Sequence, residues 1–126
     1  STGKHIGRFM TTMTTVMAVI LAAIAIVSAM GKLRKMPQVI ESMTHVGVKP
    51  NQIPLLAYLE ILGAVGLLIG IAYPLLAFVS AGALMLYFVG AVVAHLRVKD
   101  KFKDFAPALF LAVLFAYLAY LVPTGF

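Results

Sequence analysis

One carboxylate, Glu60, interrupts a long apolar stretch and is the first residue that could do chemistry. It lies between Ile53 and Ala72, with no other charged residue in that interval. An ionised carboxylate in lipid is costly unless it is paired, hydrated or protonated. We therefore expect Glu60 to face other helices and to have a polar partner there.

Candidate partners for Glu60 stand at the ends of two other apolar stretches. Lys32 ends the first stretch, and His95 and Arg97 end the third. Tyr87 precedes His95 by two helical turns, which is roughly 12 Å along a helix axis and near the expected depth of Glu60. The sequence thus predicts one polar pocket that contains Lys32, Glu60, Tyr87, His95 and Arg97. Three roles are open for this pocket: it fixes helix register through an ion pair, it binds the head group of a quinone or another polar-headed lipid, or it handles protons.

Other cofactor chemistries leave no pattern in the sequence. The chain has no cysteine, which excludes disulfides and thiolate ligands. Its three histidines, His5, His45 and His95, do not have the spacing of a zinc or di-iron site. Only His45 and His95 could approach each other at one depth, as a bis-histidine haem requires. We expect no metal site, no covalently bound cofactor and no catalytic residue; if the pocket binds a ligand, that ligand is a quinone or lipid.

The composition requires a membrane around these residues. The chain has 126 residues, of which 63% are hydrophobic and 11% charged, and its mean hydropathy is +1.05. Soluble domains average about 45–50% apolar and about 25% charged residues. A soluble domain and a disordered chain are therefore both excluded. The formal charge of +6 fits basic loops beside anionic lipid, and we expect no nucleic-acid partner because no basic face carries interleaved aromatic residues.

Four apolar stretches predict the elements that position the polar residues, namely residues 10–30, 53–72, 74–94 and 105–122. Each is close to the roughly 20 residues with which a helix crosses a bilayer. Backbone groups in lipid must form hydrogen bonds within their own segment, so each stretch should be a helix. We expect an all-α integral membrane four-helix bundle that forms a single transmembrane domain over residues 1–126.

The segment between the first two stretches carries its own pattern. Met36, Val39, Ile40, Met43 and Val46 recur at steps of three and four residues, with polar residues between them. This spacing predicts a short amphipathic helix that lies in the membrane interface. The two prolines that follow, at positions 50 and 54, predict an extended segment before the second stretch.

Small residues predict which helix faces pack together. One face of the first stretch carries Ala18, Ala22, Ala25 and Ala29, and one face of the second carries Gly63, Gly66 and Gly70. Membrane helices associate by close backbone approach at such stripes. Both stripes favour one bundle with these faces inside.

The basic residues predict the orientation in the membrane. The loops after the first and third stretches together carry eight Lys and Arg residues, whereas the N-terminal tail carries two, Lys4 and Arg8. The positive-inside rule places the two basic loops in the cytoplasm. Both termini should then lie outside the cytoplasm.

Several motifs resemble the DoxX-like family of small four-helix membrane proteins. They are Ser28-Ala29-Met30-Gly31-Lys32-Leu33, a Gly47 and Pro50 turn, the run from Glu60 through Gly63 and Gly66 to Gly70, and His95-Leu96-Arg97. The resemblance covers nearly the whole chain. It implies a four-helix bundle in a bacterial plasma membrane, with Lys32, Glu60, His95 and Arg97 as motif residues. Some relatives are subunits of a thiosulfate:quinone oxidoreductase, and others are linked to redox complexes or to the assembly of other membrane proteins.

Two functions follow from the residues and the resemblance. The first is an accessory subunit of a larger, redox-linked membrane complex, bound to other membrane subunits and without a catalytic centre of its own. The alternative is a quinone- or lipid-binding component of a membrane oxidoreductase, with its pocket around Glu60. A channel or solute carrier is disfavoured, because one polar pocket without a polar lining in the outer half does not make a path across the membrane. The stripe of Thr11, Thr14 and Thr15 is the only evidence against this, and threonine hydroxyls can bond their own helix backbone.

Overall fold

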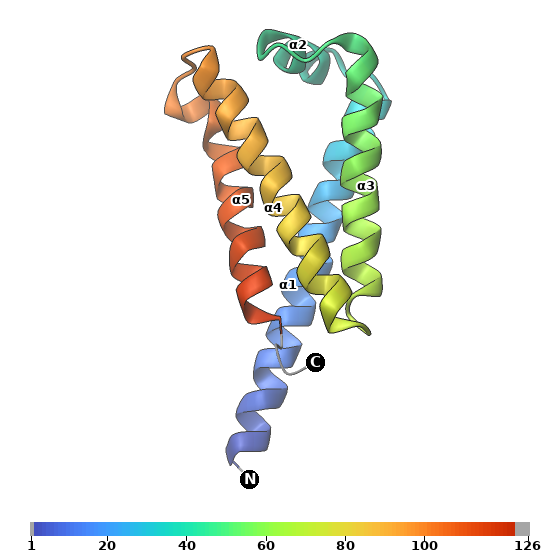
Figure 1. The fold of residues 1–126 in the computed structure, drawn as a ribbon, viewed down its shortest axis with the longest axis vertical. Helices are drawn as coiled ribbons and strands as arrows, with labels where there is room; N and C mark the ends of the chain where they lie inside the picture. The colour runs from blue at the N-terminus through green and yellow to red at the C-terminus, as the bar shows by residue number, and fades with distance from the viewer. Residues whose placement is uncertain (1, 123–126) are drawn as a thin grey trace.

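The computed structural model describes residues 2–122, with side chains from residue 12 onward. The described chain is helical and contains no strand (Figure 1). Four of its helices are long and apolar enough to cross a membrane. The expected all-α membrane bundle is therefore confirmed. The elements are α1 (Thr2–Leu33), α2 (Pro37–His45), the 3-10 turn η1 (Pro50–Gln52), α3 (Ile53–Ile69), α4 (Pro74–Arg97) and α5 (Phe102–Leu121).

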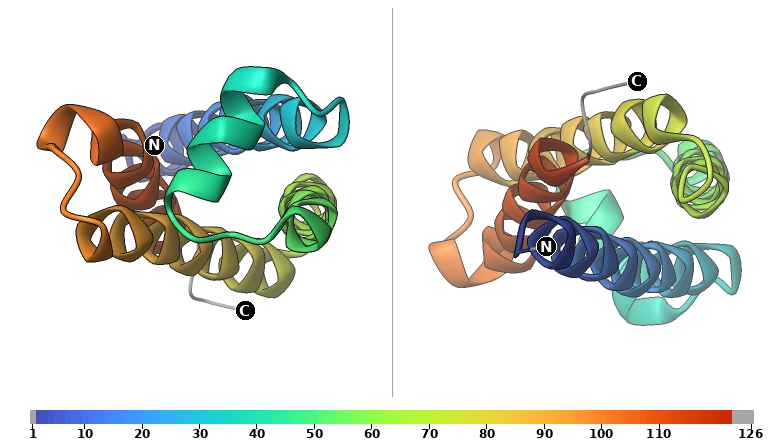
Figure 2. Two further views of the ribbon diagram at one scale, coloured as in Figure 1. Left: turned by 90° about the horizontal axis from the view of Figure 1, so that it is seen from above. Right: turned by 90° about the horizontal axis from the view of Figure 1, so that it is seen from below.

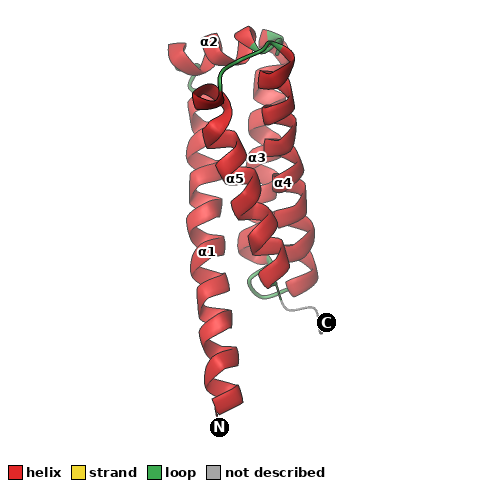
Figure 3. Cartoon of the chain, turned by 90° about the vertical axis from the view of Figure 1, so that its left-hand side faces the viewer, coloured by secondary structure: helices red, strands yellow, loops and turns green. Residues whose placement is uncertain are grey.

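The four long helices form a ring in which each packs against two neighbours. Helix α1 packs against α3 and α5, and α4 packs against the same two helices from the other side (Figure 2). Helix α2 lies across one end of this ring, nearly perpendicular to the long helices (Figure 3). We call this the α2 end. Both basic loops lie at the α2 end, and the chain enters and leaves the described structure at the opposite end.

Helix boundaries differ from the expected stretches at several ends. Helices α1 and α4 continue to Leu33 and Arg97, because long basic side chains near a helix end can reach the membrane interface. Helix α3 ends at Ile69, three residues earlier than expected. The backbone turns there, with the Tyr73 N–H donating to the Gly70 carbonyl at 3.0 Å. Pro74 then takes the first position of α4, where its missing N–H costs nothing.

The segment before α3 is a 3-10 turn and not the extended piece that its prolines predicted. The Gln52 N–H donates to the Lys49 carbonyl at 2.9 Å, and the Lys49 N–H donates to the Gln52 side-chain oxygen at 3.1 Å. Pro50 and Pro54 occupy first-turn positions of η1 and α3. The prediction was wrong because proline fits a helical first turn as well as an extended chain.

The small residues lie where the helices come closest. All four alanines of the α1 stripe are buried, and Ala22, Ala25 and Ala29 have no exposed surface. The glycines of α3 face α4, since a Cβ atom on Gly63 would lie 2.7 Å from the Leu84 side chain. A Cβ atom on Gly66 would collide with the Ser80 hydroxyl, and one on Gly70 with the backbone of Ala77. Small residues therefore set the spacing between α3 and α4.

Candidate functional site

A buried ion pair joins α1 to α3 near the α2 end. The Lys32 Nζ atom lies 2.5 Å from Glu60 Oε1, and the exposed fractions of the two side chains are 8% and 0%. Lys32 Nζ also donates a hydrogen bond to the Ser28 hydroxyl at 2.9 Å. The ammonium is thus held by one group on the neighbouring helix and one on its own.

Helical periodicity explains why these side chains meet. On α1, Lys32 follows Ala25 and Ala29 at steps of four and three residues, so it continues the buried alanine face. On α3, Glu60 belongs to a buried face that recurs at the same steps, with Ala57 before it and Ala64 after it. Each charge therefore lies on the packed side of its helix, where only the other charge can neutralise it.

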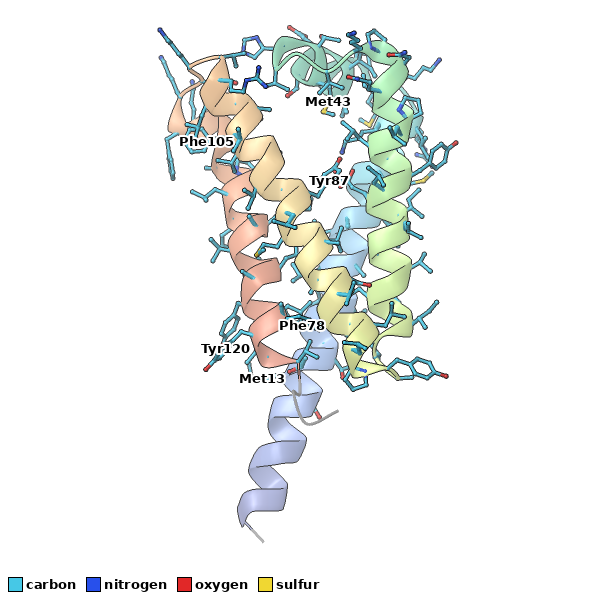
Figure 4. All side chains as sticks on the ribbon, viewed as in Figure 1. Met13, Met43, Phe78, Tyr87, Phe105 and Tyr120 are labelled. Atoms are coloured by element: carbon cyan, nitrogen blue, oxygen red, sulfur yellow. The ribbon has the colours of Figure 1, made fainter. Side chains whose placement is uncertain are left out.

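Tyr87 of α4 completes this polar cluster. Lys32 Nζ lies 5.8 Å from the centre of the Tyr87 ring, within the range of a cation–π contact. Tyr87 also interacts electrostatically with Glu60. The side chain points inward from α4 toward α3 (Figure 4). The structure thus brings together Lys32, Glu60 and Tyr87 from three different helices.

One carboxylate oxygen of this cluster is not satisfied by a hydrogen bond. Glu60 Oε2 is buried and has no hydrogen-bond partner among the described residues. A groove of about 530 Å³ runs between α3 and α4, and its lining includes Gly63, Gly66, Ser80 and Tyr87. Glu60 is not part of this lining, so Tyr87 is the side chain that connects the groove with the ion pair. A phenol and an ammonium can donate hydrogen bonds to a carbonyl, and a carboxylate can accept one from a hydroxyl.

The structure does not bring His95 or Arg97 to the ion pair. His95 turns toward the α4–α5 loop, where its Nδ1 atom lies 2.7 Å from Asp100 Oδ2. Arg97 is exposed at the end of α4. The two residues follow the expected helical face in sequence, but α4 diverges from α3 toward the α2 end, as the ribbon shows. Their side chains therefore reach the interface and not Glu60.

Asp100 is a polar centre that the sequence reasoning missed. Its Oδ1 atom lies 2.8 Å from His45 Nε2 of α2, so one carboxylate holds two imidazoles from two helices. The hydrogen bond and the negative charge of Asp100 raise the pKa of His45 above its usual range. Hydrogen bonds from His45 and then His95 lower the pKa of Asp100. A sequence signal existed, because Asp100 is the only acidic residue between α4 and α5, but nothing indicated that α2 folds back over this loop.

The remaining residues singled out in the sequence are the histidines considered as metal ligands and the threonine stripe of the outer half. No group of three or more metal-ligating side chains occurs between residues 12 and 122. Thr14 and Thr15 line a cavity of about 150 Å³ between the four long helices, at the end opposite α2. The side chains of His5 and Thr11 lie outside the described part of the chain.

Comparison with known proteins gives one family. The model of the DoxX-like family matches residues 16–117, which run from α1 through most of α5. A search of curated proteins found no match, and a search of solved structures found none either. The match includes most or all of each of the four spanning helices and the whole Lys32, Glu60 and Tyr87 cluster. The chain therefore belongs to the DoxX-like family.

Proposed function

We propose that this chain is a small accessory subunit of a larger, redox-linked complex in a bacterial plasma membrane, without a catalytic centre of its own. The ion pair carries the proposal, because Lys32 is already bonded to Glu60 and Ser28 within the chain. Charges that satisfy each other in this way fix the register of α1 against α3 and leave little for a substrate. The redox link rests on the family, some of whose members are subunits of a quinone-reducing enzyme.

Helix α5 offers the surface for other subunits. Only 17% of an apolar 18-residue stretch of α5 is buried inside the structure, whereas 28% of the corresponding stretch is buried in each of the other three spanning helices. Phe110, Val113 and Tyr117 are exposed on one face of α5. Aromatic side chains supply large contact area at low cost in conformational entropy, which suits a protein interface. This face supports binding to a helix of another membrane subunit.

Crosslinking in native membranes tests this proposal. The natural chain has no cysteine, so a single Tyr117→Cys variant can carry a photoreactive maleimide without side reactions. We expect one discrete protein adduct in high yield from this position. The matched control is Val27→Cys, which is 71% exposed on α1 and should give lipid adducts only. Equal lipid labelling from both positions would contradict a partner on α5.

The proposal includes the orientation of the chain. The α2 end should face the cytoplasm and the termini the opposite side, because the basic loops lie at the α2 end. A cysteine in place of Tyr73, which lies in the α3–α4 turn and is 63% exposed, should react with an impermeant maleimide in intact cells. A cysteine in place of Lys101 should react only after the cells are opened. The reverse pattern would invert the orientation.

A quinone or polar-headed lipid is a second candidate ligand, and a specific observation favours it. Glu60 Oε2 lacks a partner, and the α3–α4 groove ends beside Tyr87. A tail in the groove would bring a head group to the Tyr87 hydroxyl. Ala83 is an exposed residue of the groove lining, so Ala83→Phe should fill the groove without disturbing the core.

Mass spectrometry of extracted lipids decides this second candidate. If it is correct, the purified native chain retains a quinone, Ala83→Phe loses it, and Ala23→Phe on the exposed face of α1 keeps it. A native chain without quinone, or equal retention in the two variants, would exclude the groove as a quinone site.

A further inference from the structure

Burial holds helix α2 in its place only in part. None of its nine residues is fully buried, although Val39, Ile40 and Met43 are half-buried. Its N-terminal end is fixed by a tight turn after α1, in which Lys35 has a φ of 53° and the Met36 N–H donates to the Gly31 carbonyl at 3.2 Å. An element with so little buried surface depends on specific polar contacts for its position.

The polar contact at the other end of α2 is the one with Asp100. His45 is the last residue of α2, and its Nε2 atom lies 2.8 Å from Asp100 Oδ1. The second carboxylate oxygen lies 2.7 Å from His95 Nδ1, so α4 holds the carboxylate in position. The Asp100 N–H also donates to the His95 carbonyl at 3.1 Å. We refer to His45, Asp100 and His95 as the carboxylate clamp.

The side chain of Met43 shows what α2 covers. Met43 points from α2 toward the interior of the bundle, at the end where Tyr87 points inward from α4 (Figure 4). With the clamp closed, α2 therefore lies over the end of the bundle that contains the Lys32 and Glu60 ion pair.

The charge of the clamp depends on whether His45 is protonated. An ionised aspartate only accepts hydrogen bonds, so His45 and His95 must each donate an N–H to it. When His45 is protonated, the contact gains a full opposite charge, and charge-assisted hydrogen bonds are stronger than neutral ones. When His45 loses its proton, a weaker neutral contact remains.

The groups around His45 determine the direction of the pH effect. Asp100 from the α4–α5 loop, Asp104 from α5 and Glu41 from α2 all favour its charged form. The pKa of His45 is therefore raised, and the charged clamp is present below that pKa and lost as the pH rises through it. The pKa of Asp100 is lowered, so the clamp is lost at the acid end only when the pH falls through that lowered value.

We propose that the carboxylate clamp of His45, Asp100 and His95 acts as a pH-sensitive latch. The latch holds α2 over the end of the bundle in mildly acidic conditions and releases it as the pH rises. The release loosens the His45 end of α2, which residues 46–49 still join to η1, while the turn at Lys35 and Met36 acts as the hinge.

Distance measurements by electron paramagnetic resonance test the latch directly. Because the natural chain has no cysteine, nitroxide labels can be placed at Ser42→Cys on α2 and Lys103→Cys on α5, both exposed positions. The protein is reconstituted in lipid nanodiscs and measured at about pH 5.5 and about pH 8.5. These values lie on either side of the ordinary histidine pKa of about 6.5, with the wider margin on the alkaline side because the pKa of His45 is raised. We expect the ratio of closed to open α2 to fall roughly twofold to fivefold at the higher pH, as for an exposed ion pair.

Three variants give the proposal its controls. Asp100→Asn, which keeps an acceptor oxygen but loses the charge, should show the distribution of the native chain at high pH at both pH values. His45→Gln should show no change with pH, since glutamine can donate a hydrogen bond but does not titrate. Lys49→Gln, which removes an exposed charge at the same end of the bundle but outside the clamp, should keep the response of the native chain. A second pair of nitroxide labels, on α1 and α3, reports whether any variant has lost the packing of the helix bundle. An unchanged distance distribution in the native chain between the two pH values, or a full response in His45→Gln, would overturn the latch.

Discussion

Removal of the Lys32 ammonium should lower the free energy of unfolding by far more than the loss of an ordinary intramembrane hydrogen bond does. In Lys32→Met, Glu60 Oε1 loses its ammonium while Oε2 already lacks a partner, in a side chain with no exposed surface. A buried charge that loses its partner costs about 3–5 kcal/mol. We expect a loss of about 3–4 kcal/mol in the free energy of unfolding.

The opposite variant should cost less, and the difference tests the geometry. In Glu60→Gln, Lys32 lies in the last turn of α1 and can extend its ammonium toward the interface, so we expect a loss of about 1–2 kcal/mol. The double variant should cost less than Lys32→Met alone, with a coupling energy of about 2–3 kcal/mol. Lys49→Met, an exposed charge at the same end, is the matched control and should be neutral within about 0.5 kcal/mol.

Unfolding by sodium dodecyl sulfate, followed by far-ultraviolet circular dichroism, gives these free energies. The helical signal is the suitable probe, because the chain has no tryptophan. Interhelical hydrogen bonds in a well-studied membrane protein contribute about 0.6 kcal/mol on average. A coupling energy at or below that value would refute the reasoning, since the pair would then be no more than an ordinary polar contact.

Two further predictions concern packing, and thermal unfolding in detergent measures both. Gly70→Ala should lower the stability by about 1–3 kcal/mol, because the new methyl group meets the backbone of Ala77, which cannot move aside. Gly90→Ala, where the methyl group meets nothing within 4 Å, should be neutral or stabilising by up to about 1 kcal/mol, and equal effects of the two would contradict the helix spacing. Phe115→Ala should cost about 3–5 kcal/mol, because Phe115 is fully buried and stacks on Phe88 with ring centres 5.7 Å apart; a loss under about 1 kcal/mol would place this ring outside the core.

The sequence predicts the spanning helices well because lipid leaves the backbone few alternatives. A run of apolar residues long enough to cross a bilayer must be helical, and the match between residues 74–94 and α4 follows from that rule alone. Helix ends were less predictable. Lys32 and Arg97 belong to helices although they are charged, since their long side chains let the apolar part stay in lipid.

A polar contact could be predicted only where both of its residues lie on helix faces that point into the bundle. Lys32 and Glu60 each continue a buried face, so periodicity alone indicates that both point inward. His95 also lies on the face of α4 that carries Tyr87, but its hydrogen-bond partner depends on the positions of α2 and of the α4–α5 loop. Asp100 was missed for the same reason, because the distance from His45 to Asp100 depends on tertiary structure that no local pattern contains.

Native mass spectrometry after gentle extraction from the source membrane is the most direct test of the accessory-subunit account. The account predicts that the chain appears in a fixed stoichiometric ratio with at least one other membrane protein, and that the α5 variant Tyr117→Ala weakens this association. A chain that appears only alone or with copies of itself would contradict the account. Any small-molecule mass that it then retained would be traced to the groove beside Tyr87.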